Sequence, residues 1–181
     1  MGRTRDDAAG ECFDKSARLM GLANPGGPLI DRRAVQEDPK RVPFPRAWLG
    51  DSLDFSFGGL KTAVRNFMIQ DAGKTPVEDI AASPRAAIVD VLVKKTVRAA
   101  ERAGLDTVCV GGGVAANQGL KTAMEASCRA AGLRLVIPPP ELCTDNAAMI
   151  AAAAYPRLSR GQSDPLEFDT LSINPTELLS D

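Results

Sequence analysis

The first hydrophobic pattern along the chain has the spacing of a helix. Over residues 6–22, three apolar side chains recur at i, i+4 and i+7 and would share one face: Phe13, Ala17 and Met20. Asp6 and Asp7 stand where an acidic residue can cap a helix start. We therefore predict a helix over 6–22 that buries this face and is capped by one of these aspartates.

Two more helical patterns follow a loop-rich stretch over 31–59, which carries three prolines. They cover 60–71 and 75–104. The second opens with Thr75-Pro76-Val77-Glu78, the pattern of a capping box with proline in the first turn. It also contains Ser83-Pro84, and proline removes a backbone hydrogen bond, so we expect a break or kink there.

The last third of the chain contains two short β-rich runs, 107–110 and 133–137, separated by a helical stretch over 117–131. This order predicts a β-α-β unit with two parallel strands and a right-handed crossover. An Ala-rich helix to about Leu158 should follow, capped by Thr144 or Asp145 and buried. Two parallel strands need neighbours, so the chain is expected to be the C-terminal part of a larger α/β protein.

Composition narrows the chemistry. The 181 residues carry 22 Lys and Arg against 23 Asp and Glu, a balance that argues against a tail-like nucleic-acid binder. The chain has no histidine, which excludes a histidine base or a histidine-ligated metal built from this chain alone. Its four cysteines form no CxxC pair; Cys109 and Cys128 are expected to be buried thiols. With neither a signal peptide nor an apolar run of roughly 18 residues, a cytoplasmic protein is expected.

The pattern over 108–117 predicts a strand, a glycine turn (Gly111, Gly112 and Gly113) and a helix start. Glycines let a backbone approach a ligand, and a helix N-terminus offers free N–H groups, so a nucleotide-contacting turn is favoured. A bare turn is the alternative. A dinucleotide fingerprint is disfavoured because Pro138 follows the second strand, where an acidic residue would bind the ribose.

Four other features have an ordinary structural interpretation from the residues alone. Asp14 could face solvent and pair with Lys15 or Arg18, and Asp31 could be a turn residue. The prolines and glycines of 25–28 could form only a stiff turn. Asp145 could cap the following helix or contribute to a metal or substrate site.

Five motifs together resemble one family. DDAAGECFDK (6–15), PGGP (25–28), DFSFGGLKT (54–62), VGGGVAAN (110–117) and CTDNAAMIA (143–151) are similar, in order and spacing, to motifs of the tRNA adenosine threonylcarbamoyltransferases. That family was once described as an O-sialoglycoprotein endopeptidase, but no nucleophile–base pair or HExxH motif supports a peptidase here. The resemblance covers 5–175 and the C-terminal half of the family's length.

The resemblance implies a partial actin-like ATPase (ASKHA) domain, the second of two ribonuclease-H-like halves, with a helical insertion. Residues 1–30 would begin this half, 31–104 would be the mostly helical insertion, 105–160 the remaining β-α-β-α part and 161–181 a tail. Two departures are Gly58, where the family often carries serine, and the expected break at Ser83-Pro84.

It also implies an activity: transfer of threonylcarbamoyl from threonylcarbamoyl-AMP to N6 of adenine 37 in tRNAs that read codons starting with A. Asp14, Gly27, Asp31 and Asn117 match residues that contact the adenylate, and Gly111–Gly113 would line the nucleotide. Asp145 matches a ligand of one divalent metal, iron or zinc, whose two histidine ligands are absent here. Implied partners are tRNA, a paralogous subunit and a small P-loop ATPase, with no membrane.

Because one metal ligand and half a cleft are expected, the chain alone is expected to be inactive. Two alternatives remain open. The chain could be a non-catalytic nucleotide-binding subunit that docks on a complementary half, or another ATPase or kinase of the same fold.

Overall fold

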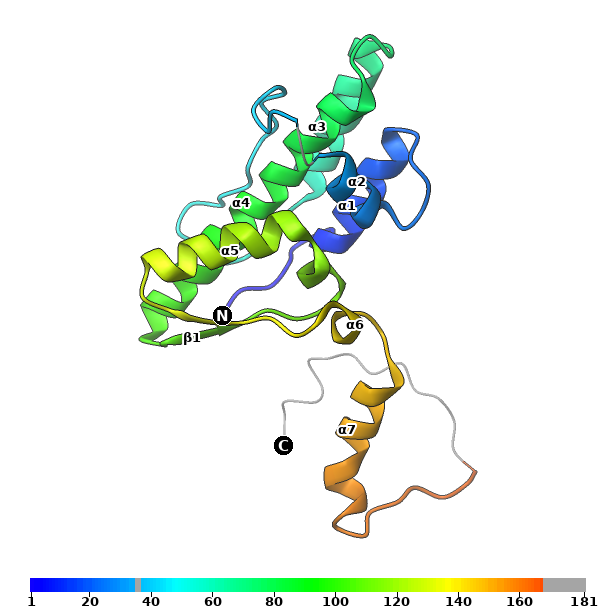
Figure 1. The fold of residues 1–181 in the computed structure, drawn as a ribbon, viewed down its shortest axis with the longest axis vertical. Helices are drawn as coiled ribbons and strands as arrows, with labels where there is room; N and C mark the ends of the chain where they lie inside the picture. The colour runs from blue at the N-terminus through cyan, green and yellow to red at the C-terminus, as the bar shows by residue number, and fades with distance from the viewer. Residues whose placement is uncertain (35–36, 168–181) are drawn as a thin grey trace. The chain divides into compact units, whose positions relative to one another are not determined.

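The structure, a computed structural model, describes residues 1–34 and 37–167 and divides the chain into two compact units, 1–145 and 146–181. Figure 1 labels most of the elements. The first unit contains α1 (Ala9–Leu19), α2 (Gly26–Arg33), α3 (Gly58–Asp71), α4 (Val77–Ala103), β1 (Thr107–Cys109), the 3-10 helix η1 (Gly113–Ala116), α5 (Gln118–Ala130), β2 (Arg134–Val136) and α6 (Pro140–Cys143). The second contains α7 (Ala147–Leu158).

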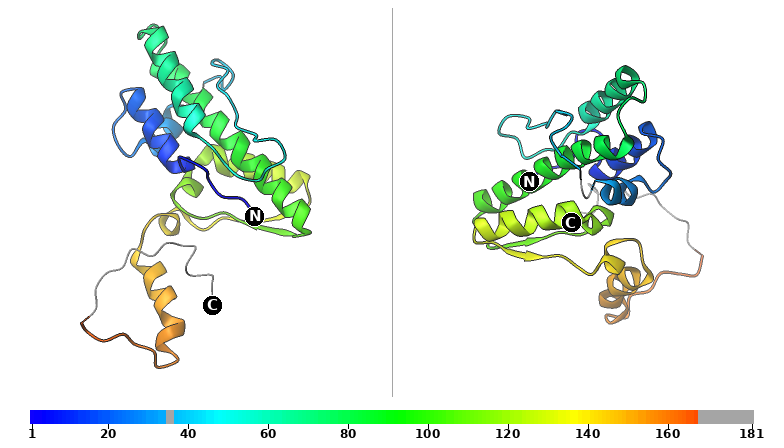
Figure 2. Two further views of the ribbon diagram at one scale, coloured as in Figure 1. Left: turned by 180° about the vertical axis from the view of Figure 1, so that it is seen from behind. Right: turned by 45° about the horizontal axis from the view of Figure 1, so that its top comes forward.

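The two strands pair in parallel, with Val108 opposite Leu135, which confirms the predicted pair of parallel strands around a helix. Helices α4 and α5 lie side by side on one face of this sheet (Figure 2), where Val108 packs with Leu120 and Met124. Successive strand residues point to opposite faces. Cys109 therefore lies on the other face and is exposed, so the prediction that it is buried is wrong, whereas Cys128 is buried.

A larger core lies among α1, α2, α3 and α4. Phe13, Ala17 and Met20 of α1 are all buried there, as the helical pattern predicted. The core also holds Ile30 from α2, Val64 from α3 and Ile88 from α4, each with no exposed surface. These contacts stabilise the helices that carry the site.

Helix α4 runs without interruption through Pro84, so of the break or kink predicted at Ser83-Pro84 the break is wrong. Both residues are buried in the core, and the Ser83 hydroxyl accepts a hydrogen bond of 3.0 Å from the Val42 amide. Packing on this scale outweighs one missing helical hydrogen bond. The capping-box prediction also fails, because α4 starts at Val77 and the Thr75 hydroxyl bonds Asp71 instead.

The start of α1 differs from the prediction in a way that recurs elsewhere in the fold. The helix begins at Ala9, and Glu11 accepts a hydrogen bond from the Ala8 amide. Asp6 instead accepts hydrogen bonds from the amides of Phe57 (2.7 Å) and Gly58 (3.1 Å), where α3 begins. Asp6 is therefore the cap of a helix that starts about fifty residues further along the chain.

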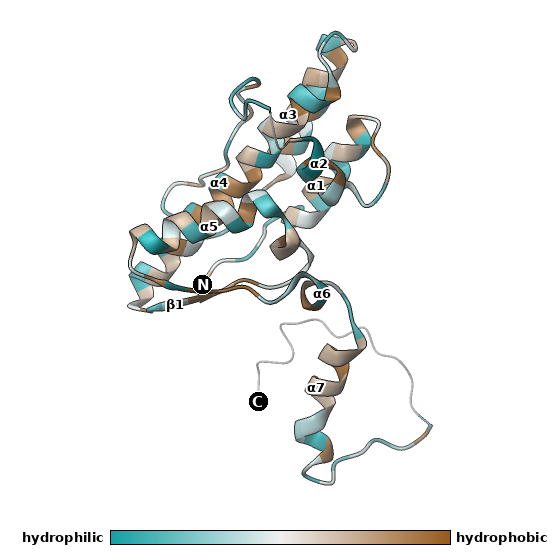
Figure 3. Ribbon diagram, viewed as in Figure 1, coloured by the Kyte–Doolittle hydropathy of each residue, from teal (hydrophilic) through white to brown (hydrophobic). Residues whose placement is uncertain are grey.

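In the second unit, α7 begins at Ala147 and is capped by Asn146, whose side chain accepts a hydrogen bond from the Met149 amide, rather than by Thr144 or Asp145. No residue of α7 is buried, which contradicts the predicted buried helix; Ile150 and Tyr155 are 69% and 71% exposed. Figure 3 shows the apolar residues of this helix. None of the described helices is long and apolar enough to cross a bilayer.

Removing the Asp6 carboxylate should destabilise the first unit in a pH-dependent way. Burial raises the pKa of Asp6, but hydrogen bonds from Ser56, Phe57 and Gly58 lower it more, so the pKa lies below its ordinary value. Its stabilisation is therefore present above about pH 4 and is lost as the pH falls through the folded-state pKa. Asp6→Ala should cost about 1 kcal/mol at pH 7 and less at pH 3, measured by urea unfolding.

Glu125→Ala removes an exposed carboxylate of α5 and is the matched control. A cost for Asp6→Ala that stays constant between pH 7 and pH 3, or that equals the cost of the control, would contradict the capping role.

Candidate functional site

The first unit contains a cavity of about 530 Å³, within the size range of small-molecule and nucleotide sites. Its walls come from α1, α2, η1 and the segment after α6. Its lining comprises Gly10, Phe13, Asp14, Pro25, Gly27, Pro28, Asp31, Arg32, Gly113, Val114, Ala116, Asn117 and Thr144. Apolar surface from Phe13, the two prolines and Val114 is therefore combined with a few carboxylate, amide and guanidinium groups.

Asp14 holds the first wall in place. One oxygen of its carboxylate, Oδ1, accepts hydrogen bonds from the amides of Gly26 (2.8 Å) and Gly27 (3.3 Å), the first two residues of α2. The stretch 25–28 is thus the start of a helix, and its interpretation as a stiff turn is wrong. Lys15, the expected partner of a solvated Asp14, pairs with Asp7 and Glu11 instead.

Gly26 allows the close approach of α1 and α2. A Cβ atom at this position would lie 2.4 Å from Cβ of Ala17 and 2.9 Å from Cα of Asp14, too close for any side chain. At Gly27 the nearest atom to a Cβ would be Cβ of Phe13, at an ordinary 3.8 Å. The fold therefore requires glycine at position 26, whereas position 27 has room on the side of the cavity.

Asp31 joins the first wall to the second. It lies within α2 and is therefore no turn residue. Its Oδ2 accepts a hydrogen bond of 2.8 Å from the Gln118 amide, and its Oδ1 accepts one of 3.3 Å from the Gly119 amide, both at the start of α5. Arg85 of α4 donates to the same Oδ1 at 3.0 Å and to the Ala34 carbonyl at 2.9 Å. Three helices thus meet at one half-buried carboxylate.

Asn117 and the glycine turn form the second wall. The Asn117 side chain is buried and accepts a hydrogen bond of 2.9 Å from the Leu120 amide, so it caps α5. Gly112 has φ of 83°, which a residue with a side chain adopts only under strain. Of the three glycines, Gly113 lines the cavity, whereas Gly111 and Gly112 do not.

Asp145 does not line the cavity, although its neighbour Thr144 does. Asp145 is exposed. Among residues 1–34 and 37–167, no group of three or more His, Cys, Asp or Glu side chains lies close enough together to hold a metal ion. A divalent ion needs more ligands than one carboxylate. Asp145 therefore has no partner ligands for a metal ion among the described residues, and ligation by Asp145 stays a prediction.

Sequence reasoning identified Asp14, Gly27, Asp31, Asn117 and Gly113 as site residues, and all of them line the cavity. It missed Arg85, which carries no motif and contacts Asp31 from a residue 54 positions away. It also missed Arg32 and Phe13 as lining residues. Phe13 was assigned to the core, and Arg32 lies one position after Asp31, so proximity to a candidate was the available signal.

The contrast between the two glycines yields a direct test of the α1–α2 contact. Gly26→Ala should lower the free energy of unfolding by about 1–3 kcal/mol, because the new methyl group overpacks against Ala17 and Asp14. Gly27→Ala should leave stability unchanged or raise it, because alanine is the better helix former. Urea unfolding of both variants measures the difference, and equal stabilities would contradict the geometry.

Proteins with similar sequences show which family this chain belongs to. A family model described as tRNA N6-adenosine threonylcarbamoyltransferase matches residues 1–152. Proteins of that name from Synechococcus sp. (strain JA-3-3Ab) and Desulfotalea psychrophila are 54% and 49% identical over 95% of the chain. One from Geobacter metallireducens is 50% identical over 99% of it.

The chain covers 48%, 52% and 54% of these three proteins, so it spans about half the length of the curated relatives it matches. Identity near 50% over nearly every described element, together with the match over 1–152, leaves no ambiguity about ancestry. The chain belongs to the tRNA N6-adenosine threonylcarbamoyltransferase family.

Proposed function

We propose that this chain forms the adenylate-binding half of a tRNA threonylcarbamoyltransferase. The observation that carries the proposal is the cavity rimmed by Asp14, Asp31 and Asn117 in a member of this family. The two hydrogen bonds that Asp14 accepts from α2 go to Oδ1, which leaves Oδ2 able to accept from a ligand. Asp31 Oδ2 accepts one hydrogen bond from the Gln118 amide and can accept a second one. Both groups suit the hydroxyl donors of a ribose.

The proposed reaction moves an acyl group between two adenosine units. N6 of adenine 37 in tRNA attacks the carbonyl carbon of threonylcarbamoyl-AMP, and a C–N bond forms. The C–O bond to the phosphate breaks, AMP leaves with the electron pair, and the attacking nitrogen loses a proton. The ring delocalises the lone pair of this amine, so catalysis depends on positioning and on stabilising the charge that develops on the leaving group.

In this proposal the residues of the chain bind and orient the adenylate. The apolar surface of Phe13, Pro28 and Val114 would pack against its base, and the backbone at Gly113 would approach it closely. Arg32 lies on the same cavity and supplies a positive charge suited to a phosphate. Arg85 acts through Asp31 and is a positioning residue.

The complete fold, the partners and the location are proposed from the family relationship. The fold would be the second ribonuclease-H-like half of an actin-like ATPase domain, which agrees with the small sheet covered by helices. The tRNA, a paralogous subunit, a small P-loop ATPase and a cytoplasmic location are part of the same proposal. Any divalent metal at Asp145 would need further ligands, and the two histidines that the resemblance implies are absent from this sequence.

A glycine pair tests the proposed ligand without disturbing the fold. Gly27 and Gly59 are the second residues of α2 and α3, and a Cβ at either meets no close contact. Isothermal titration with AMP, the leaving product, should give wild-type affinity for Gly59→Ala and at least about tenfold weaker binding for Gly27→Ala. This loss corresponds to about 1.4 kcal/mol from a methyl group that enters the cavity.

AMP binding that is absent from the wild type, or unaffected by Gly27→Ala, would contradict the proposed site. The same proteins are then supplied with threonylcarbamoyl-AMP and unmodified tRNA. Binding without turnover is the expected result, because the chain spans about half of its relatives. Robust transfer by this chain alone would contradict the proposal that it is only one half of the catalytic cleft.

A further inference from the structure

The C-terminal part of α4 carries a row of exposed cations far from the cavity. Lys94, Arg98 and Arg102 are spaced four residues apart, so their side chains follow one another along the helix surface. Arg85 and Arg102 lie about 25 Å apart along the axis, at 1.5 Å per residue. Lys94, the near end of the row, is nine residues from Arg85, which places it about 14 Å away along the axis and on the opposite side of the helix.

A single tryptophan lies beside the cations. Trp48 comes from the loop between α2 and α3, is 39% exposed, and has the Lys94 ammonium 5.1 Å from its ring centroid. Trp48, Lys94, Lys95 and Arg98 line a hollow of about 270 Å³. An exposed ring beside several cations spread along a helix suits an extended polyanion with unpaired bases, such as a nucleic acid.

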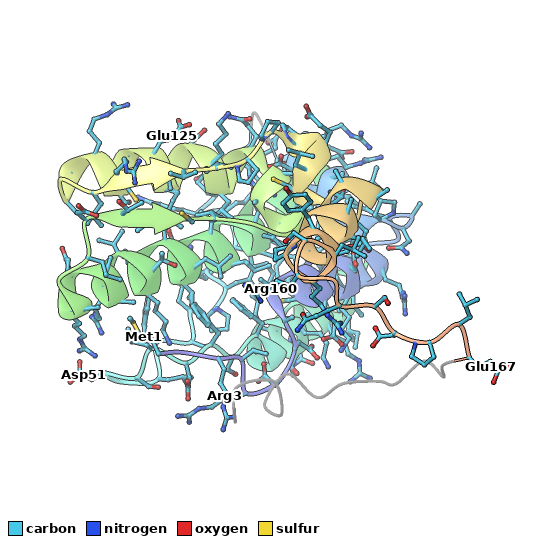
Figure 4. The ribbon with its side chains drawn as sticks, turned by 90° about the horizontal axis from the view of Figure 1, so that it is seen from below. Met1, Arg3, Asp51, Glu125, Arg160 and Glu167 are labelled. Atoms are coloured by element: carbon cyan, nitrogen blue, oxygen red, sulfur yellow. The ribbon has the colours of Figure 1, made fainter. Side chains whose placement is uncertain are left out.

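The N-terminal segment extends the positive charge. Arg5 pairs with Asp54 at 3.0 Å, and the buried ammonium of Lys95 donates to the Asp54 carbonyl. Burial lowers the pKa of Lys95, and the nearby charges of Arg5 and Arg98 lower it further, although Asp54 opposes them. Figure 4 shows Met1, Arg3 and Asp51 on the side of the first unit opposite Glu125.

The positive charge is only partly neutralised by nearby carboxylates, which include the exposed Glu101 of α4. Among the described residues, the carboxylates that pair with these cations are Asp51 and Asp54. Asp51 is 94% exposed at its side chain and lies 3.7 Å from Arg98 and 3.6 Å from Arg102, so it contributes little attraction in water. The whole chain has a net charge of −1, so this excess of cations is a local feature.

We propose that the α4 basic surface, defined as Arg5, Trp48, Lys94, Arg98 and Arg102, binds the sugar-phosphate backbone of the tRNA. Cations spaced along a helix match successive phosphates, and the exposed Trp48 ring offers a stacking surface to an unpaired base. A tRNA is long enough to contact this surface while another part of it reaches the cavity. The inference rests on the proposed function for the identity of the nucleic acid, but its charge argument stands on the surface itself.

Trp48 provides the measurement, because it is the only tryptophan in the chain. Titration with an unmodified tRNA transcript should quench Trp48 fluorescence in the wild type. The variant Lys94→Ala/Arg98→Ala/Arg102→Ala should bind at least about tenfold more weakly. The slope of log affinity against log salt should fall by about 0.7–0.9 for each phosphate that the variant no longer neutralises.

The matched control is Arg65→Ala/Lys121→Ala/Arg129→Ala, which removes three exposed cations from α3 and α5. It changes the net charge by the same amount and should keep wild-type affinity for tRNA. Urea unfolding of both triple variants checks that the fold is intact. If both triple variants weaken tRNA binding equally, the effect depends only on net charge, and the proposed tRNA-binding surface is wrong.

A gain of affinity gives a second test that does not depend on a folding defect. Asp51→Asn removes the carboxylate between Arg98 and Arg102, while the hydrogen bond from Arg102 to the Asp51 carbonyl remains possible. Asp51→Asn should tighten tRNA binding about threefold or more at low salt. Unchanged or weaker binding by Asp51→Asn would contradict the proposal.

The AMP titration separates this inference from the proposed function. If the wild type binds AMP and tRNA but neither the cationic triple variant nor Asp51→Asn alters tRNA affinity, the surface is wrong and the adenylate site stands. If the wild type binds an acidic polypeptide such as polyglutamate through Trp48 but not tRNA, the surface serves a protein partner and the inference is overturned.

Discussion

The first unit depends on carboxylates that satisfy the start of a helix in a distant part of the chain. A helix N-terminus leaves amide groups without partners and carries partial positive charge. Neither Pro25 before α2 nor Phe57 before α3 supplies a side-chain cap. Asp14 and Asp6 supply these bonds, and Asp31 does the same for α5 together with Asn117.

These long-range caps also build the site. Asp14 and Asp31 each accept hydrogen bonds from the start of a helix, and both residues also line the cavity. Their orientation is fixed by the fold before any ligand arrives, which reduces the ordering cost of binding. The same two residues therefore link the stability of the α1–α2–α5 contact to the recognition of an adenylate.

Local patterns predicted what depends on neighbouring residues, and the resemblance indicated five of the thirteen residues that line the cavity. The two strands and the buried face of α1 are confirmed, and Asp14 and Asn117 line the cavity, whereas their contact with an adenylate stays a prediction. Three of the errors concern partners that lie far away in sequence. From its position Asp6 looked like the cap of α1, Pro84 looked like a helix breaker without its core contacts, and nothing near Arg85 indicated its contact with Asp31.

The central claim is that a preformed cavity in this chain binds an adenylate. Amide chemical shifts of the isotopically labelled 19.1 kDa chain, followed during titration with AMP, test it most directly. The account predicts that the shifted amides cluster at the start of α2, in η1 and at Asn117, with those of Arg98 and Arg102 unchanged. Shifts centred on the α4 basic surface, or no saturable shifts in the cavity, would contradict it.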